Sequence, residues 1–174
     1  MQALQSGDSF PSQKVPRLGG GTLTLGTPGG GCDWQMVVVY RGLHCPICKK
    51  YLTRLEELKG RFHGLGIDVV VVSGDPEDKA QAMADALGLT MPVGYDLSTE
   101  QMRALGVYIS EPRGPQETDR PFPEPGIFVI NEAGRLHIID ISNAPFARPD
   151  LEALAGGLEF IRKNGYPIRG TWAA

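Results

Sequence analysis

The sequence predicts an α/β fold with a central mixed β-sheet flanked by helices on both faces. Two continuous apolar runs, at residues 36–40 and 67–72, are typical of strands buried on both faces. Segments with helical periodicity follow both runs, and this alternation favours a largely parallel sheet. A tight turn between residues 126–130 and 136–141 adds an antiparallel hairpin at one edge.

Length and composition limit the classes of protein that fit. The chain has 174 residues, 41% of them hydrophobic and 21% charged, as expected for a globular protein with a buried core. Its net charge of −3 argues against nucleic acid or an anionic membrane surface as a partner. No apolar run approaches the roughly 18 residues of a membrane span. Residues 1–8 lack the basic start and apolar stretch of a secretory signal, so we expect a cytoplasmic protein.

The first 34 residues are rich in glycine. Between two glycine runs, residues 22–25 alternate polar and apolar side chains, which predicts a short edge strand. Neither run is followed by the Gly-Lys-Ser/Thr of a phosphate-binding loop. We therefore expect one domain over residues 1–174, with residues 1–34 as an N-terminal extension.

Two helices are expected in the first half of the chain. After Cys45, apolar residues recur at helical spacing and form a stripe of Ile47, Tyr51, Leu55, Leu58 and Phe62. After the second buried strand, Asp75 is the expected N-cap and Pro76 the expected first residue of the next helix. That helix directs Ala80, Met83, Ala84 and Leu87 inward and ends at Gly88.

The second half holds two more helices, a long loop and the hairpin. Ser98 and Gln101 form a capping box for a short helix that ends at Gly106. Residues 107–125 contain five prolines and no periodicity, which predicts a long loop. The hairpin turn uses residues 131–134. A last helix begins near Pro149, and its inward face carries Leu151, Leu154, Leu158 and Ile161.

The cysteines carry the chemistry. Three thiols cannot make a disulfide framework, but two of them form the motif Cys45-Pro46-Ile47-Cys48 where a buried strand ends and a helix begins. Free backbone N–H groups and the helix dipole favour a thiolate there, so we expect a lowered pKa for Cys45. Cys45 is then the exposed nucleophile, and Cys48, one turn along, the sheltered resolving thiol. Pro46 fits the first turn because its missing N–H breaks no helical hydrogen bond.

Other residues near the motif allow alternatives. Arg41 and His44 could stabilise the thiolate, and His44 could carry a proton, or both could be solvated residues at a loop mouth. Cys32 lies before the strand, roughly 20 Å from Cys45, and is expected to be a partly buried residue beside a glycine turn. A zinc site lacks half of its usual four ligands, because His63 and His137 lie on separate elements.

Two segments resemble a known family. Residues 40–48 resemble the Tyr-Arg-Gly-x-x-Cys-Pro-x-Cys signature of peroxiredoxin-like redoxins, the alkyl hydroperoxide reductase and thiol-specific antioxidant family, whose fold is thioredoxin-like. Residues 125–134 are similar to the Pro-x-x-Phe-x-Ile-Asp-x-x-Gly segment of redoxins. The resemblance implies that Pro125 is cis and faces the cysteine pair. Glu124 would then present its backbone to a substrate thiol, and Arg120 could supply a positive charge near the site.

The resemblance implies a thiol-dependent oxidoreductase with antioxidant activity. Cys45 would attack a hydroperoxide or a disulfide and form a sulfenic acid or a mixed disulfide. Cys48 would resolve either intermediate, and an external thiol reductant, such as a thioredoxin or glutathione system, would restore the dithiol. No cofactor is needed. Because homodimers occur among related proteins, a homodimer is one expected assembly.

Departures from the family pattern leave the activity open. Peroxiredoxins have a threonine three residues before the reactive cysteine and a proline four before that, where this chain has Gly42 and Val38. Thioredoxins have a buried acid six residues before their first cysteine, where this chain has Val39. The residues therefore fit a peroxidase, a disulfide reductase or a redox-sensing module without turnover. A purely structural domain would require inert, buried thiols.

Overall fold

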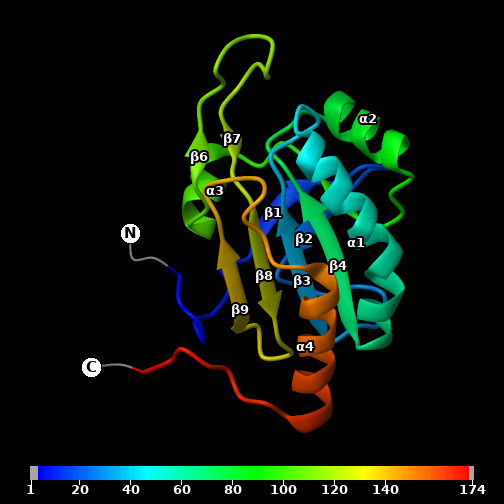
Figure 1. Cartoon of the computed structure of the whole chain (residues 1–174), viewed down its shortest axis with the longest axis vertical. Helices are drawn as coiled ribbons and strands as arrows, with labels where there is room; N and C mark the ends of the chain where they lie inside the picture. Colours follow the sequence, from blue (N-terminus) through cyan, green and yellow to red (C-terminus); the bar gives the residue numbers. More distant parts are fainter. Residues whose placement is uncertain (1–3, 173–174) are drawn as a thin grey trace.

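The computed structural model describes residues 4–172 and is built around a five-stranded mixed sheet (Figure 1). Its strand order is β5-β4-β3-β8-β9. Strands β3, β4 and β5 run parallel, whereas β8 and β9 are antiparallel to their neighbours. The strands are β3 (Trp34–Val39), β4 (Ile67–Val72), β5 (Val93–Gly94), β8 (Gly126–Ile130) and β9 (Leu136–Ile141). The predicted mixed α/β sheet is confirmed.

Helices cover both faces of this sheet. On one face lie α1 (Pro46–Gly64), α2 (Glu77–Leu87) and α4 (Leu151–Asn164), and Figure 1 shows α1 and α4 side by side. The other face is covered by α3 (Thr99–Leu105) and by a separate hairpin of β1 (Gln13–Pro16) and β2 (Thr22–Leu25). Alternate residues of β3 and β4 pack into the two cores, which is why both strands are mainly apolar. No helix within residues 4–172 combines the length and apolarity needed to cross a membrane.

The buried face of α1 differs from the predicted stripe. Ile47 is 40% exposed and Tyr51 is only half-buried, whereas Cys48 and Leu52 are buried with Leu55, Leu58 and Phe62. The inward stripe therefore starts at Cys48. The register differs because the second cysteine itself faces the core, as free cysteines often do.

The start of α2 also corrects a prediction. The helix begins at Glu77 with Pro76 as its N-cap residue, and no side chain caps it. Asp75, the predicted N-cap, instead turns toward the segment before α1 and accepts a hydrogen bond from the Leu43 N–H at 2.7 Å. Asp75 therefore does not cap α2 and instead binds the loop that precedes α1.

The remaining elements follow the sequence closely. The capping box at Ser98 is present, and Gly88 and Gly106 end their helices in the left-handed conformation that favours glycine. Residues 131–134 turn between β8 and β9 as expected. In α4, Asp150 is the N-cap residue, and Leu154 and Ile161 pack partly buried beside the buried residues of that helix.

The predicted loop at residues 107–125 is more ordered than expected. Two short strands, β6 (Ile109–Ser110) and β7 (Phe122–Pro123), pair within it, and the connection between them projects beyond the sheet in Figure 1. Pairs this short are set by tertiary packing, so their local sequence carries no periodicity.

The peptide bond before Pro125 is trans, since no cis bond occurs between residues 4 and 172. The cis prediction was wrong. Glu124 N–H donates to Tyr108 O, and Pro125 O accepts from Ser142 N–H, so each of the two residues makes a backbone hydrogen bond where the chain enters β8. An extended trans connection satisfies these bonds without a tight turn.

Candidate active site

The turn between β3 and α1 places the cysteine pair at the carboxyl edge of the parallel strands. Gly42 has φ of +142°, a conformation that favours glycine. A Cβ atom there would lie 2.7–3.0 Å from the carboxyl group of Asp75, which fills the space beneath the turn. The Cys45 N–H donates to Gly42 O at 3.1 Å and closes the turn. A glycine at position 42 therefore lets the buried carboxyl group approach the backbone.

Cys45 is the N-cap residue of α1. Its Sγ accepts a hydrogen bond from the Cys48 N–H at 3.2 Å. The Cys48 thiol is the main group that lowers the pKa of Cys45, to about 6, and the Cys48 N–H and Arg41 lower it further, while burial opposes them. At neutral pH this sulfur is therefore mostly a thiolate.

Cys48 has the opposite tendency. Its hydrogen bond to Cys45 raises its pKa far above the ordinary range, and burial and the charge on Cys45 act in the same direction. The pair is therefore divided into one thiolate and one thiol that keeps its proton.

Both sulfurs are buried, which corrects the prediction of an exposed nucleophile. Cys45 is 1% exposed and Cys48 is 0% exposed, and both belong to the core cluster that includes Tyr40. Leu43 packs against the same cluster. The Cys48 thiol, the Cys48 N–H and Arg41 lower the pKa of Cys45 although the residue is not at the surface.

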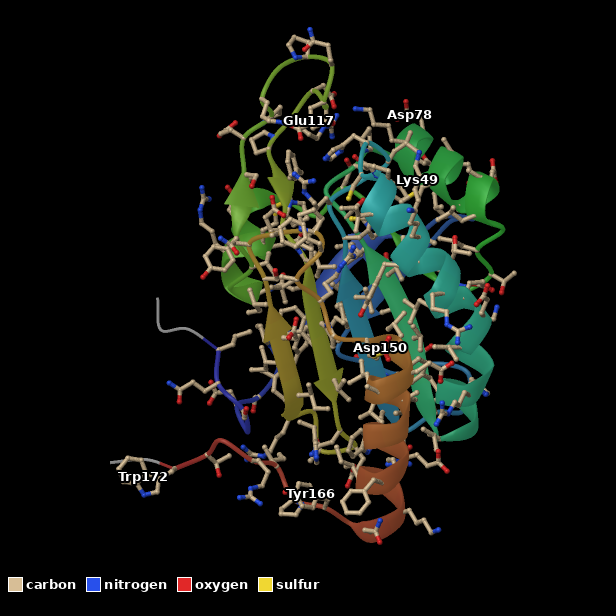
Figure 2. The ribbon with its side chains drawn as sticks, in the orientation of Figure 1. Lys49, Asp78, Glu117, Asp150, Tyr166 and Trp172 are labelled. Carbon is tan, nitrogen blue, oxygen red and sulfur yellow. The ribbon has the colours of Figure 1, made fainter. Side chains whose placement is uncertain are left out.

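Arg41 is held in place beside the pair by anionic and aromatic groups. Its Nε lies 3.2 Å from Glu124 Oε2, and a second nitrogen lies 3.7 Å from Glu117. Its guanidinium stacks 4.7 Å from the centroid of Phe122. Ser110 donates to the other oxygen of Glu124 at 2.6 Å. Figure 2 shows Glu117 in the connection between β6 and β7, on the side of the molecule where α1 and α2 begin.

Glu124 acts here through its side chain. The sequence interpretation gave it a backbone role toward a substrate thiol, but its N–H pairs with Tyr108 and its buried carboxylate holds Arg41. The reason is the short β6–β7 pairing, which fixes the Glu124 backbone next to β6 and turns its carboxylate toward Arg41.

His44, Pro46 and Arg120 lie around this centre in different environments. The His44 ring packs edge-on against Phe122 at 4.6 Å, and burial, assisted by Arg41, lowers its pKa, so the ring is neutral near pH 7. Pro46 is the first residue of α1, as its position in the motif predicts. The Arg120 guanidinium is paired with Asp96 and Asp119, each at 3.3 Å, so two carboxylates already balance its charge.

The comparisons with known proteins agree with this geometry. A family model described as the AhpC/TSA family matches residues 6–139. The chain belongs to the AhpC/TSA family.

The proteins similar to this AhpC/TSA protein include a thiol-disulfide oxidoreductase and peroxiredoxins. The thiol-disulfide oxidoreductase ResA of Halalkalibacterium halodurans is 27% identical over 96 residues, which are 55% of this chain and 47% of ResA, so the chain spans about half of that relative. A peroxiredoxin-like protein from Aquifex aeolicus has a TM-score of 0.75 at 18% identity, covering 92% of this chain and 90% of that one. The C45S mutant of peroxiredoxin 6 from Arenicola marina has a TM-score of 0.76 at 17% identity, covering 98% of this chain and 80% of that one. These structures show a thioredoxin-like fold of the peroxiredoxin type.

Several groups at the site of this AhpC/TSA protein were not predicted. Asp75 could have been found, because it follows β4 at the edge where parallel strands converge. Glu117 and Arg148 had no such signal because both lie in irregular segments, and Phe122 had none because its strand, β7, has only two residues. Arg148 stacks 4.1 Å from the ring centroid of Tyr51, and its charge lowers the pKa of Cys48 slightly against the larger effects that raise it.

Cys32 stands apart from the pair, as its sequence position predicts. It is half-buried beside the glycine turn, and its N–H donates to Gly29 O at 3.0 Å. Burial raises its pKa, and the carboxylates of Asp68 and Asp33 raise it further. It lies at the start of β3, whereas Cys45 follows the end of that strand.

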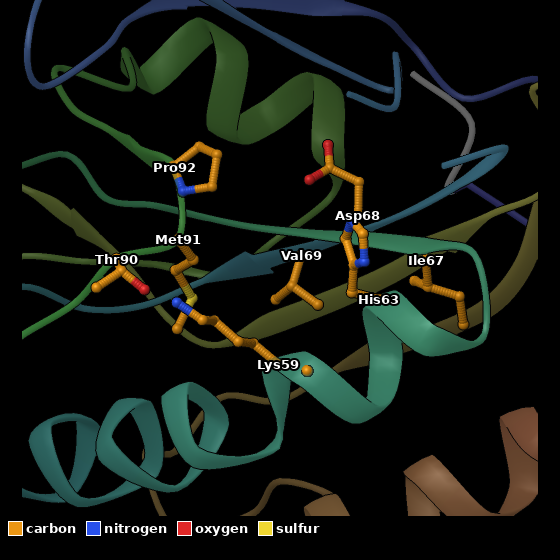
Figure 3. A pocket seen from close by; sticks show the side chains of 9 residues that line it. Lys59, His63, Ile67, Asp68, Val69, Thr90, Met91 and Pro92 are labelled. Atoms are coloured by element: carbon orange, nitrogen blue, oxygen red, sulfur yellow. The ribbon is translucent and has the colours of Figure 1, made fainter. Parts of the chain in front are cut away.

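A separate pocket lies along the far half of α1 and is shown in Figure 3. Its lining includes Lys59, His63, Asp68 and Met91. Lys59 is eleven residues after Cys48 on the same helix, about 17 Å along its axis, so the pocket is not part of the cysteine site. Over residues 4–172, no three His, Cys, Asp or Glu side chains gather closely enough to hold a metal ion.

Proposed function

We propose that this protein is a thiol-dependent oxidoreductase with peroxiredoxin-like antioxidant activity, which reduces hydroperoxides or disulfides through a Cys45–Cys48 dithiol and disulfide cycle. The observation that carries the proposal is the division of the pair into a thiolate with a pKa of about 6 and a protonated partner three residues away. The AhpC/TSA family and the similarity to ResA support the same chemistry.

With a hydroperoxide, the Cys45 thiolate attacks the terminal oxygen. An S–O bond forms and the O–O bond breaks, so that Cys45 becomes a sulfenic acid and an alcohol leaves after taking a proton. The Cys48 sulfur then attacks Cys45, the S–S bond forms, and the S–O bond breaks with release of water. An external thiol reductant, such as a thioredoxin or glutathione system in the cytoplasm, returns both sulfurs to thiols.

The burial of Cys45 favours a small hydroperoxide as substrate. A sulfur that is 1% exposed can meet two peroxide oxygens more readily than a disulfide held in another folded protein. The Arg41 guanidinium supplies the N–H donors that would stabilise the charge developing on the peroxide oxygens. Disulfide reduction is the second candidate, favoured by the second cysteine one turn along the helix and by the ResA similarity.

The test is turnover by purified protein with hydroperoxide or with a model disulfide, each with a thiol reductant. We expect peroxide-dependent consumption of reductant, and at least a hundredfold loss with Cys45→Ser. Absence of turnover with both substrates, or full activity of Cys45→Ser, would contradict the proposal. Light scattering of the same samples tests the expected homodimer.

A further inference from the structure

We infer that Glu117 is a specificity-determining residue, which disfavours anionic hydroperoxides at the cavity beside Arg41. The inference rests on the proposed function, because it concerns which hydroperoxides reach Cys45. Glu117 lies in the connection between β6 and β7, more than sixty residues after the cysteine motif, and its carboxylate faces Arg41.

A cavity of about 360 Å³ is bounded by Arg41 and by residues of β6, β7 and their connection. Its lining consists of Arg41, Ser110, Glu111, Arg113, Glu117 and Phe122. The Phe122 ring forms an apolar wall, with the Arg41 guanidinium stacked 4.7 Å from its centroid. The ring of His44, the residue before Cys45, packs edge-on against the same Phe122 ring. The cavity wall therefore continues into the cysteine turn, and the charge of Arg41 lowers the pKa of Cys45.

The Glu117 carboxylate is fixed at the wall of this cavity. Its Oε2 accepts from the Arg113 N–H at 2.8 Å, and its Oε1 accepts from Arg113 Nε at 3.2 Å. The Glu117 N–H donates to Gly114 O at 3.0 Å and closes the turn that carries the carboxylate. The same Oε1 lies 3.7 Å from the Arg41 guanidinium. The carboxylate is therefore held beside Arg41 by its own turn and cannot move into solvent without breaking these bonds.

The buried charges at the cavity leave an excess of one negative charge. Arg41 lies between two carboxylates, Glu117 and Glu124, whose side chains are 9% and 5% exposed. Two exposed residues of the lining, Glu111 and Arg113, carry opposite charges that balance each other. Water and salt screen exposed charges much more than buried ones. An anion that enters the cavity is therefore repelled, whereas an uncharged molecule is not.

A carboxylate on the substrate would compete with Glu117 for Arg41. Because the turn at residues 113–117 holds Glu117 in place, the two carboxylates would face each other in a poorly hydrated site, which is unfavourable. Glu117→Gln removes the negative charge but keeps the shape of the side chain and an oxygen that accepts from the Arg113 N–H. This variant therefore tests the charge of Glu117 separately from its role in the turn.

The test compares alkylation of Cys45 by iodoacetamide, which is uncharged, and by iodoacetate, an anion of nearly the same size, in a Cys32→Ser background. Both reagents react with the same thiolate, so a change in its pKa alters both rates equally and does not affect their ratio. We expect the ratio of the iodoacetate rate to the iodoacetamide rate to increase at least about fivefold in Glu117→Gln. Turnover with cumene hydroperoxide and with its para-carboxylate derivative should shift in the same direction.

Two references make the outcome decisive. Asp78→Asn removes an exposed carboxylate of α2 at the same end of the molecule (Figure 2) and should change the ratio less than about twofold. N-acetylcysteine amide, an uncharged small thiol, gives the ratio in free solution. The parent ratio should be at least about fivefold lower, which tests the inference even if Glu117→Gln fails to fold.

Three results would overturn the role of Glu117. They are an unchanged ratio in Glu117→Gln, an equal increase in Asp78→Asn, and a parent ratio equal to that of the free thiol. Alkylation needs no turnover, so absence of reductant consumption by the parent with hydroperoxide or disulfide contradicts the proposed function instead.

Discussion

Two cysteines lie near opposite ends of β3 and differ in their exposure and in the direction in which their pKa is shifted. Cys32, before the strand, is the more accessible, yet burial and the nearby carboxylates of Asp68 and Asp33 raise its pKa. Cys45, after the strand, is almost inaccessible, yet its pKa is lowered to about 6. The comparison shows that the local field and hydrogen bonds, more than exposure, determine which thiol ionises.

The surroundings of the two ends explain the difference. Parallel strands direct their carboxyl ends to one edge, where α1 begins with free N–H groups aimed at Cys45. Within residues 4–172, no helix begins beside Cys32, and the charges near this thiol are mainly acidic.

The largest expected effect comes from removing each thiol in turn. Cys45→Ser should lower turnover at least about a hundredfold, whereas Cys32→Ser should leave it within about twofold. The measurement is the initial rate of reductant consumption with hydroperoxide. Equal losses of turnover in Cys45→Ser and Cys32→Ser would contradict the distinction between the thiols at the two ends of β3.

A glycine beside each cysteine offers a matched test of stability. Gly42→Ala brings a Cβ within 3.0 Å of Asp75 in a strained conformation, so we expect a loss of about 2–4 kcal/mol in the free energy of unfolding. Gly31, next to Cys32, also has positive φ but no atom within 4 Å of its added Cβ. Gly31→Ala should therefore cost only about 1–2 kcal/mol. Urea denaturation measures the free energy of unfolding of both variants. Equal losses in Gly42→Ala and Gly31→Ala would contradict the tight packing of Gly42 against Asp75.

One arginine faces each thiol, and their removal tests the electrostatic account. Arg41→Met should raise the pKa of Cys45 by about one unit, because the thiolate loses a hydrogen bond and a positive charge. Alkylation of Cys45 should then be several times slower at pH 6 and unchanged at pH 9, where the thiolate dominates in both proteins. Arg162→Met, which removes the cation near Cys32, should leave the pH dependence of Cys45 alkylation unchanged. The readout is the rate of iodoacetamide labelling, followed by mass spectrometry.

The smallest expected effect is at Cys32. Asp68→Asn removes a charge that raises the pKa of Cys32, so its labelling rate near pH 8 should increase about twofold to threefold. Labelling of Cys45 should not change. A slower rate at Cys32 would show that the hydrogen bonds of Asp68 to Gly29 and Gln35 matter more than its charge.

Much of the fold was predictable because its signals are local. Buried strands, the capping box at Ser98 and the glycine helix ends each follow from a few neighbouring residues, and the structure confirms them. The position of Cys45 at the start of α1 was predictable for the same reason.

The failures involve contacts between distant segments. Asp75 looked like a helix cap, but its carboxyl group instead serves a turn 32 residues earlier in the sequence. Glu124 was assigned through its backbone, yet its side chain meets Arg41 because β6 and β7 pair. The burial of Cys45 also depends on segments that pack from elsewhere in the chain, and no local pattern reports them.

The N-terminal segment reaches both edges of the central sheet. Ser9 forms a bridge with Arg135 beside β9, and Arg17 forms one with Gly94 in β5. Unpaired edge strands invite strand addition by another chain, and here residues of the same chain occupy part of each edge. Resistance to aggregation would therefore depend on a segment far in sequence from the cysteine motif. A protein that lacks this N-terminal segment is expected to keep its thiol chemistry and to aggregate through the exposed edges of the sheet.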